Sequence, residues 1–145
     1  MKPMDGSPLK VPGVMDFLWS PAANTISYWT PEMGNSPARV VIMSMPNKIL
    51  IRDKHLVFVT TLTMQWHATG SHLLVHATRQ NAKTKAPMPF MLEIFSLNEK
   101  NVPVEDIEIK DNIEAVAWDN SSVRFALITK TENLEDRNTV TIYFL

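Results

Sequence analysis

Four histidines are the first candidates for chemistry, because an imidazole can bind a metal ion or transfer a proton near neutral pH. They are His55, His67, His72 and His76. The last two stand four residues apart in a stretch that predicts a strand, so they share one face. That spacing is about 13 Å along an extended strand, too far for two ligands of one ion. The chain also has no cysteine, and we expect neither a metal site nor a cofactor.

No motif in the sequence predicts an active site. There is no G-x-S-x-G nucleophile elbow, no P-loop and no glycine-rich dinucleotide loop. Asp53 and His55 are close in sequence and serines are common, but a catalytic triad is defined by geometry, not by closeness along the chain. We therefore predict that the protein is not an enzyme and takes no small-molecule substrate.

A cationic stretch, RQNAKTKAPMP from Arg79 to Pro89, predicts a long polar loop without an acidic residue. Arg79, Lys83 and Lys85 on such a loop can meet phosphate groups and release the counterions that surround them. This chemistry predicts contact with the phosphate backbone of an RNA and no reading of bases. The alternative is a solvated surface loop, which the charge pattern alone favours.

A second stretch, YWTPEMGNSPARVVIM, places an unusually long connection between two apolar strands. Two prolines restrict its backbone, and the Gly-Asn pair suits positive φ angles. It is either a structural turn that covers a neighbouring element or an interaction loop on a rigid scaffold. We expect an ion pair between Glu32 and Arg39 across this hairpin. The candidate residues of the loop are Pro31, Glu32, Gly34, Asn35, Pro37 and Arg39.

Composition limits the class of protein. The chain has 145 residues, of which 45% are hydrophobic and 20% charged, with a formal net charge of −1. That length is sufficient for one domain with a core, and the charge is not that of a strongly basic nucleic-acid binder. The sequence shows neither a signal-peptide core nor an apolar run long enough for a membrane helix. We expect a cytoplasmic protein without a membrane partner.

The elements that must position these residues are all predicted to be strands. Short segments rich in β-branched and aromatic residues alternate with Pro, Gly, Asn and Ser, and no segment has the period of an amphipathic helix. The predicted strands are Val14–Trp19, Ile26–Trp29, Arg39–Met45, Lys48–Arg52, Leu62–Trp66, His72–Thr78, Phe90–Leu97, Val104–Ile109, Ala115–Trp118, Val123–Thr129 and Thr139–Leu145.

The strands follow a repeat in which an apolar strand ends in tryptophan, a short polar turn follows, and a second apolar strand begins. Trp19, Trp66 and Trp118 mark it, with spacings of 47 and 52 residues. Four strands at such a period predict a WD40-like β-propeller, with blades at about 14–55, 57–111 and 113–145, the last incomplete. We expect the three tryptophans to pack in the core.

Three blades are fewer than a closed propeller has, so we expect a part of a larger propeller. Residues 1–13 are then a linker or the end of a preceding blade, with Ser7–Val11 as its last strand. The open edge of the third blade predicts dimerisation or aggregation of the isolated chain.

The first blade resembles that of the WD-repeat propeller subunit, designated b, of eukaryotic translation initiation factor 3. That family reads approximately GV-x-x-F-x-WSP and then YW-x-PE-x-GN-x-PARV. The matching residues here are Gly13, Val14, Phe17, Trp19, Ser20, Pro21, Tyr28, Trp29, Pro31, Glu32, Gly34, Asn35, Pro37, Ala38, Arg39 and Val40.

The resemblance continues through nearly the whole chain. The segments that carry it are the KTK loop at 83–85, LEIFSLNEKNVPVEDIEIKD at 92–111, and the pieces at 115–118 and 124–126. Three features depart from the family: HLVFVTTLTMQW lacks the usual acid and thiol, Asp119-Asn120 replaces Glu-Pro, and Ser122 replaces a glycine.

The resemblance implies a non-catalytic scaffold that helps to dock initiation factor 3 on the small ribosomal subunit, through its protein and RNA, and that contacts other subunits of the factor. The family's RNA-recognition domain and C-terminal helical region have no counterpart in these residues, so their binding roles are not carried over. Two alternatives remain open: a propeller-type protein–protein adaptor without a ribosomal role, and a truncated gene product.

Overall fold

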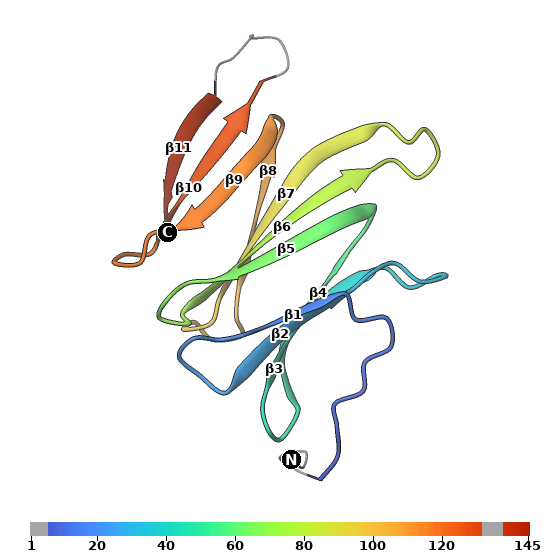
Figure 1. The fold of residues 1–145 in the computed structure, drawn as a ribbon, viewed down its shortest axis with the longest axis vertical. Coiled ribbons are helices and arrows are strands. Elements are labelled where there is room, and N and C mark those ends of the chain that lie inside the picture. The colour runs from blue at the N-terminus through green and yellow to red at the C-terminus, as the bar shows by residue number, and fades with distance from the viewer. Residues whose placement is uncertain (1–5, 132–137) are drawn as a thin grey trace.

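The computed structural model describes residues 6–131 and 138–145, and the regular structure in these ranges is β-strand (Figure 1). Eleven strands form three antiparallel sheets that follow one another along the chain. Each strand pairs with the next one in sequence, so the connections within a sheet are hairpins. The predicted all-β propeller-type fold class is confirmed in this sense.

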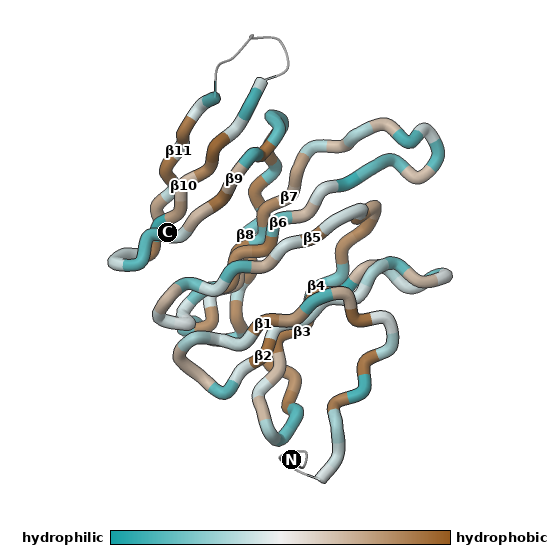
Figure 2. The backbone as a smooth tube through the Cα atoms, in the orientation of Figure 1, coloured by the Kyte–Doolittle hydropathy of each residue, from teal (hydrophilic) through white to brown (hydrophobic). Residues whose placement is uncertain are grey.

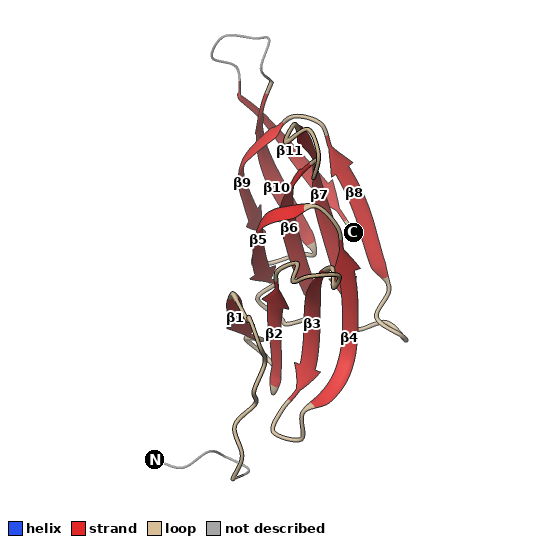
Figure 3. Ribbon diagram, turned by 90° about the vertical axis from the view of Figure 1, so that its right-hand side faces the viewer, coloured by secondary structure: helices blue, strands red, loops and turns tan. Residues whose placement is uncertain are grey.

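The first sheet has four strands in sequence order: β1 (Asp16–Trp19), β2 (Thr25–Thr30), β3 (Ala38–Ser44) and β4 (Ile49–Leu56). Figure 3 shows β2, β3 and β4 of this sheet side by side. The second sheet also has four strands: β5 (Val59–Trp66), β6 (His72–Gln80), β7 (Pro87–Ser96) and β8 (Val104–Ile109). The third sheet has three strands: β9 (Asn112–Trp118), β10 (Arg124–Lys130) and β11 (Asn138–Phe144).

Strand composition follows strand position. The middle strands β2, β3, β6 and β7 carry runs of buried residues, because other strands flank them on both sides and the apolar layers between the sheets cover them. The outer strands β4 and β8 carry most of the charges and are more exposed. Figure 2 shows the hydrophobic residues along the strands and hydrophilic residues near the tip of the β6–β7 hairpin.

Two apolar layers hold the three sheets together. Side chains such as Trp29, Val40 and Ile42 of the first sheet pack against Leu73 and Phe95 of the second sheet. The opposite face of the second sheet packs against the third sheet in a separate cluster. That cluster contains Leu74, Leu92, Ile94, Phe125 and Leu127. Truncating one of these large buried side chains to alanine costs about 2–5 kcal/mol of stability, because a cavity remains.

The repeated tryptophans join neighbouring sheets. Trp66 donates its indole N–H to the Ser27 hydroxyl of the first sheet at 3.1 Å, and Trp118 donates to the Gln65 carbonyl of the second sheet at 3.0 Å. Trp19 was predicted to pack in the core as well, but its residue is 54% exposed, so this prediction is wrong. Within the described residues no sheet lies beyond β1 to receive its ring, whereas Trp29, outside the repeat register, is only 5% exposed.

Several predicted segments differ from the observed elements. The described part of the N-terminus, including Ser7–Val11, contains no strand. β4 continues past Arg52 to Leu56, because residues 53–56 pair with residues 38–41 of β3 and an outer strand tolerates their charges. The β6–β7 hairpin is also longer than predicted, since its strands extend into the stretch that was expected to be a loop.

In the described ranges, no helix has the length and apolar character needed to span a lipid bilayer.

Candidate interaction surface

The tip of the β6–β7 hairpin is a fixed turn of residues 81–86. The Asn81 side-chain oxygen accepts hydrogen bonds from the backbone N–H groups of Lys83 and Thr84 at 2.9 and 3.0 Å. The Gln80 amide donates to the Lys85 carbonyl at 2.6 Å, and Lys85 itself has a φ of +59°. Both lysines are exposed, and neither ammonium has an ion-pair partner among the described residues. The turn therefore presents two positive charges on a defined backbone.

Arg79 does not belong to this turn. It lies in β6, where its guanidinium donates to the Pro89 carbonyl at 3.0 and 3.1 Å and pairs with Glu108 of β8 at 3.2 Å. Only 12% of its side chain is exposed. The three predicted phosphate contacts thus separate into one internally paired cation, Arg79, and two exposed ones, Lys83 and Lys85.

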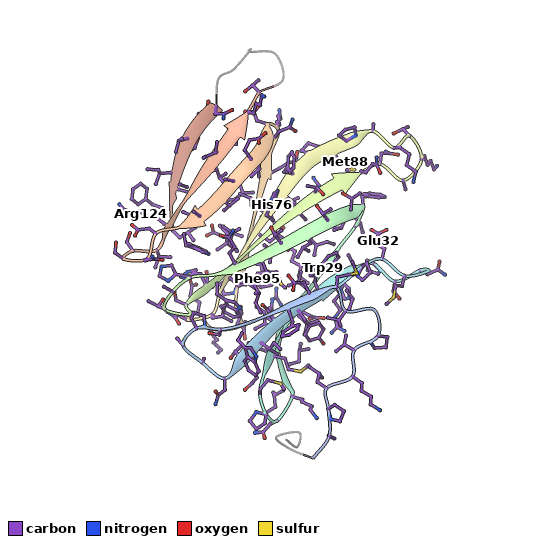
Figure 4. All side chains as sticks on the ribbon, viewed as in Figure 1. Trp29, Glu32, His76, Met88, Phe95 and Arg124 are labelled. Atoms are coloured by element: carbon purple, nitrogen blue, oxygen red, sulfur yellow. The ribbon has the colours of Figure 1, made fainter. Side chains whose placement is uncertain are left out.

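The long connection between β2 and β3 is anchored to the next sheet. Met33 and Ser36 form an isolated bridge around Gly34, whose φ of +58° suits glycine in a tight turn. The Glu32 carboxylate accepts a hydrogen bond from the backbone N–H of Phe58, in the β4–β5 connection. Figure 4 shows Glu32 beside the end of the second sheet. These contacts position the loop, whose residues 34–36 are exposed.

The expected ion pair between Glu32 and Arg39 is wrong. Arg39 instead pairs with Asp53 of the adjacent strand β4, at 2.7 Å and 2.9 Å. The two residues share the outer face of the first sheet, and Glu32 is turned toward Phe58. Because the Asp53 carboxylate is paired with Arg39, it does not orient His55 as a catalytic triad would require. The remaining predicted loop residues, Pro31, Asn35 and Pro37, lie in the same connection and gain no further role from their surroundings.

His67 and His76 pack against neighbouring side chains and have no arrangement among the described residues that indicates catalysis. His67 is 2% exposed; it hydrogen-bonds the Thr69 hydroxyl at 2.8 Å and the Asp119 carbonyl at 3.0 Å, with its ring at 5.3 Å from Trp118. Burial lowers the pKa of His76, which packs beside Phe90. No group of three or more His, Cys, Asp or Glu side chains suited to a metal ion occurs in the described ranges.

Asp119 stabilises the β9–β10 turn of the third sheet, where the sequence departs from the family pattern. Its carboxylate accepts hydrogen bonds from the Ser121 N–H and hydroxyl and from the Ser122 hydroxyl, at 2.8, 2.8 and 2.9 Å, and also pairs with Arg124. The hydrogen bond from the Ser121 backbone, with the side-chain donors, lowers the pKa of Asp119. The residues that depart from the family pattern here therefore form a self-consistent turn.

One charge cluster, with Glu93 buried at its centre, joins the first two sheets. Lys54 of β4 lies 3.5 Å from the Glu93 carboxylate of β7 and also pairs with Asp106 of β8. Glu93 is 3% exposed, and burial raises its pKa to about 7 against the opposing effect of Lys54. Sequence reasoning missed this cluster because its members come from three strands.

Two more exposed lysines were also missed. Lys110 follows the last residue of β8, and Lys130 ends β10. Neither lysine belongs to a run of basic residues, so the charge pattern did not indicate a binding site at either position. The paired strand ends Asn112 and Lys130 bring the two regions to one end of the molecule.

Residues 54–143 match the family model described as Eukaryotic translation initiation factor eIF2A. The chain belongs to this family. Its curated relatives include the subunit designated B of eukaryotic translation initiation factor 3 from Neosartorya fischeri, 42% identical over 86% of this chain and 18% of that protein. The same subunit from Bombyx mori is 36% identical over 86% of this chain and 19% of that protein. The subunit from Schizosaccharomyces pombe is 37% identical over 90% of this chain and 19% of that protein.

This member of the eIF2A family thus spans less than a fifth of the length of those relatives. The resemblance to the WD-repeat propeller subunit of initiation factor 3 is confirmed at the level of sequence. A solved structure, the crystal structure of the eukaryotic initiation factor, has a TM-score of 0.44 and 15% identity, covering 94% of this chain and 53% of that one. A Cps50 (Swd1) β-propeller domain from Myceliophteria thermophila has a TM-score of 0.34, 9% identity and coverages of 91% and 54%.

Proposed function

We propose that this chain is a non-catalytic scaffold part of translation initiation factor 3 that helps to dock the factor on the small ribosomal subunit in the cytoplasm. The observation that carries the proposal is the 36–42% identity to initiation factor 3 proteins over most of the chain. Docking uses surface complementarity and local contacts with phosphate groups. Partners are ribosomal protein, ribosomal RNA and other subunits of the factor.

In this proposal, the three sheets, at residues 16–56, 59–109 and 112–144, are consecutive blades of a larger propeller. Two observations support that arrangement. The sheets occur in chain order with an apolar layer between each neighbouring pair. A tryptophan of each later sheet donates a hydrogen bond to the sheet before it.

The proposed contact points are the two turns that project from this scaffold. The 81–86 turn offers Lys83 and Lys85 to phosphate oxygens, without reading bases. The loop around Gly34 and Asn35 offers an exposed surface to protein, because Glu32 holds its base against the next sheet. Arg79 supports the hairpin from within.

Co-sedimentation with purified small ribosomal subunits tests the proposal. The chain should bind saturably at physiological salt, and the double variant Lys83→Glu and Lys85→Glu should bind several-fold more weakly with a smaller salt dependence, by about 1–2 in the slope of log K against log salt.

The matched control changes the charge of two other exposed lysines, Lys10→Glu and Lys100→Glu, which lie away from that turn in the sequence. Equal weakening by both double variants would show that net charge, not the turn, determines binding. Absence of binding by a folded chain would contradict the ribosomal role and favour the adaptor alternative, which partners in a co-purification would then identify.

A further inference from the structure

A groove of about 820 Å³ lies where the second and third sheets meet. Its walls come from the ends of β6 and β7, the β8–β9 connection and the end of β10. Met88, labelled in Figure 4, lies on β7 at this end of the molecule. The volume is within the range of about 300–1,000 Å³ that small-ligand sites occupy. Both sheets that form the groove lie within the described chain.

One wall of the groove is apolar and aromatic. Met88, Pro89 and Phe90 contribute to it and are partly exposed. The ring of His76 packs beside that of Phe90, with centroids 5.5 Å apart, and so supports it from the same sheet. A supported, partly exposed ring can stack against a planar ligand without first being ordered.

The facing wall is polar and positively charged. Lys110 and Lys130 line it, together with Asn112 and Asp111. Neither lysine has an ion-pair partner in the described part of the chain. Arg79 also reaches the groove, but Glu108 neutralises it. Among the described residues that line the groove, Lys110 and Lys130 therefore supply two cations against the single carboxylate of Asp111.

We propose that this groove binds single-stranded RNA, with phosphates beside Lys110 and Lys130 and a base against Phe90. The site deepens the proposed function and rests on it, since it names where the RNA of a ribosomal partner would be held. It also continues toward the exposed lysines of the 81–86 turn, because Gln80 and Pro87, which flank that turn, line the groove. A strand leaving the groove can follow these charges.

The two walls together favour RNA over an acidic peptide. An acidic peptide would satisfy the lysines but would leave the aromatic wall without a planar partner. A nucleotide has both an anionic backbone and a stacking base, and stacking tolerates any base sequence. The hydroxyls of Thr60 and Thr78, at 2.7 Å from each other on the same groove, are additional polar groups in reach of a ribose.

Fluorescence anisotropy with 5′-fluorescein octauridylate and the full chain tests the proposal. The double variant Lys110→Gln and Lys130→Gln should lower the slope of log K against log salt by about 1.4, at roughly 0.7 for each phosphate contact of a single strand. Phe90→Leu should weaken binding about tenfold, because it removes a stacking ring, and Phe90→Tyr should retain affinity. Circular dichroism verifies that each variant is folded.

The control Lys10→Gln and Lys100→Gln removes the same charge elsewhere and should leave the slope unchanged. Unchanged affinity in a folded Phe90→Leu variant, or equal displacement of the RNA by octaglutamate, would overturn the proposal. If the chain binds small ribosomal subunits but not the oligonucleotide, the groove assignment fails and the scaffold proposal stands. If the chain binds the oligonucleotide but not the subunits, the scaffold proposal fails and the groove assignment stands.

Discussion

At the scale of single residues, Glu93 is a carboxyl group whose surroundings disfavour its ionised form. It is buried between the first two sheets, and its nearest cation, Lys54, is shared with Asp106. One of its carboxylate oxygens, Oε2, is buried without a hydrogen-bond partner in the described residues. Burial removes the carboxylate from water and favours the neutral acid, which raises the pKa of Glu93 despite the opposing charge of Lys54.

The first prediction concerns pH. The folded pKa of Glu93, about 7, lies above the ordinary value of 4.5, so the folded state holds a proton that the unfolded state has lost in this interval. Its contribution to stability is therefore fully present below about pH 4.5 and is lost as the pH rises to 7, by on the order of 3 kcal/mol. Above pH 7 the loss no longer grows.

Glu93→Gln isolates this effect, because an amide has the same shape and does not ionise. The variant should be more stable than the wild type at pH 8, and the two should differ little at pH 5. Urea-unfolding midpoints at the two pH values measure the difference. A constant difference between wild type and variant across this range would contradict the raised pKa.

At the scale of elements, the tryptophan hydrogen bonds add a polar link to each apolar layer between adjacent sheets. Trp118 reaches from β9 to a β5 carbonyl, and the Gln65 side chain donates back to the Val116 carbonyl at 3.1 Å. This reciprocal pair crosses the interface between the second and third sheets. Trp29 provides a contrast, because its buried indole N–H has no partner in the described residues.

We predict that Trp118→Phe destabilises the chain by about 1–3 kcal/mol more than Trp29→Phe does. Both substitutions remove an indole N–H and a similar volume of ring, but only the first leaves a carbonyl without its donor. Thermal or urea unfolding of the two variants measures the difference. Equal destabilisation would assign the role of Trp118 to packing alone.

Sequence reasoning found the eleven strands because their apolar and β-branched residues alternate locally between turn residues. It misplaced Arg79 because Pro87 and Pro89 resemble loop residues. Proline lacks a donor but keeps its carbonyl, and β7 starts at Pro87, so both prolines fit at the beginning of the strand. The Lys54–Glu93–Asp106 cluster and the groove depend on contacts between distant strands, which no local pattern encodes.

At the scale of the whole molecule, apolar side chains are exposed on the third sheet. Val140, Ile142 and Phe144 alternate along β11 and are 57–74% exposed. They lie on the face opposite the layer that packs against the second sheet, since Tyr143, between them, belongs to that layer. An exposed apolar strand face of this kind favours association between molecules.

We expect the chain to self-associate with rising concentration, and Ile142→Lys to reduce this association. The added charge would have to be buried in any contact through this face. Asn120→Lys, in the exposed β9–β10 turn, changes the net charge equally and should have a smaller effect. Light scattering over a concentration series makes the comparison. A monodisperse wild-type chain would contradict the expectation.

The tryptophan hydrogen bonds join sheets that are consecutive along the chain, and this has a consequence for synthesis. In both links the donor belongs to the later sheet, and the acceptor belongs to the earlier one. A ribosome releases the chain from its N-terminus, so each acceptor emerges before the indole that needs it. Each link joins a sheet only to its neighbour along the chain, so the described sheets can be added one at a time during translation, and neither link waits for a sheet beyond the next one.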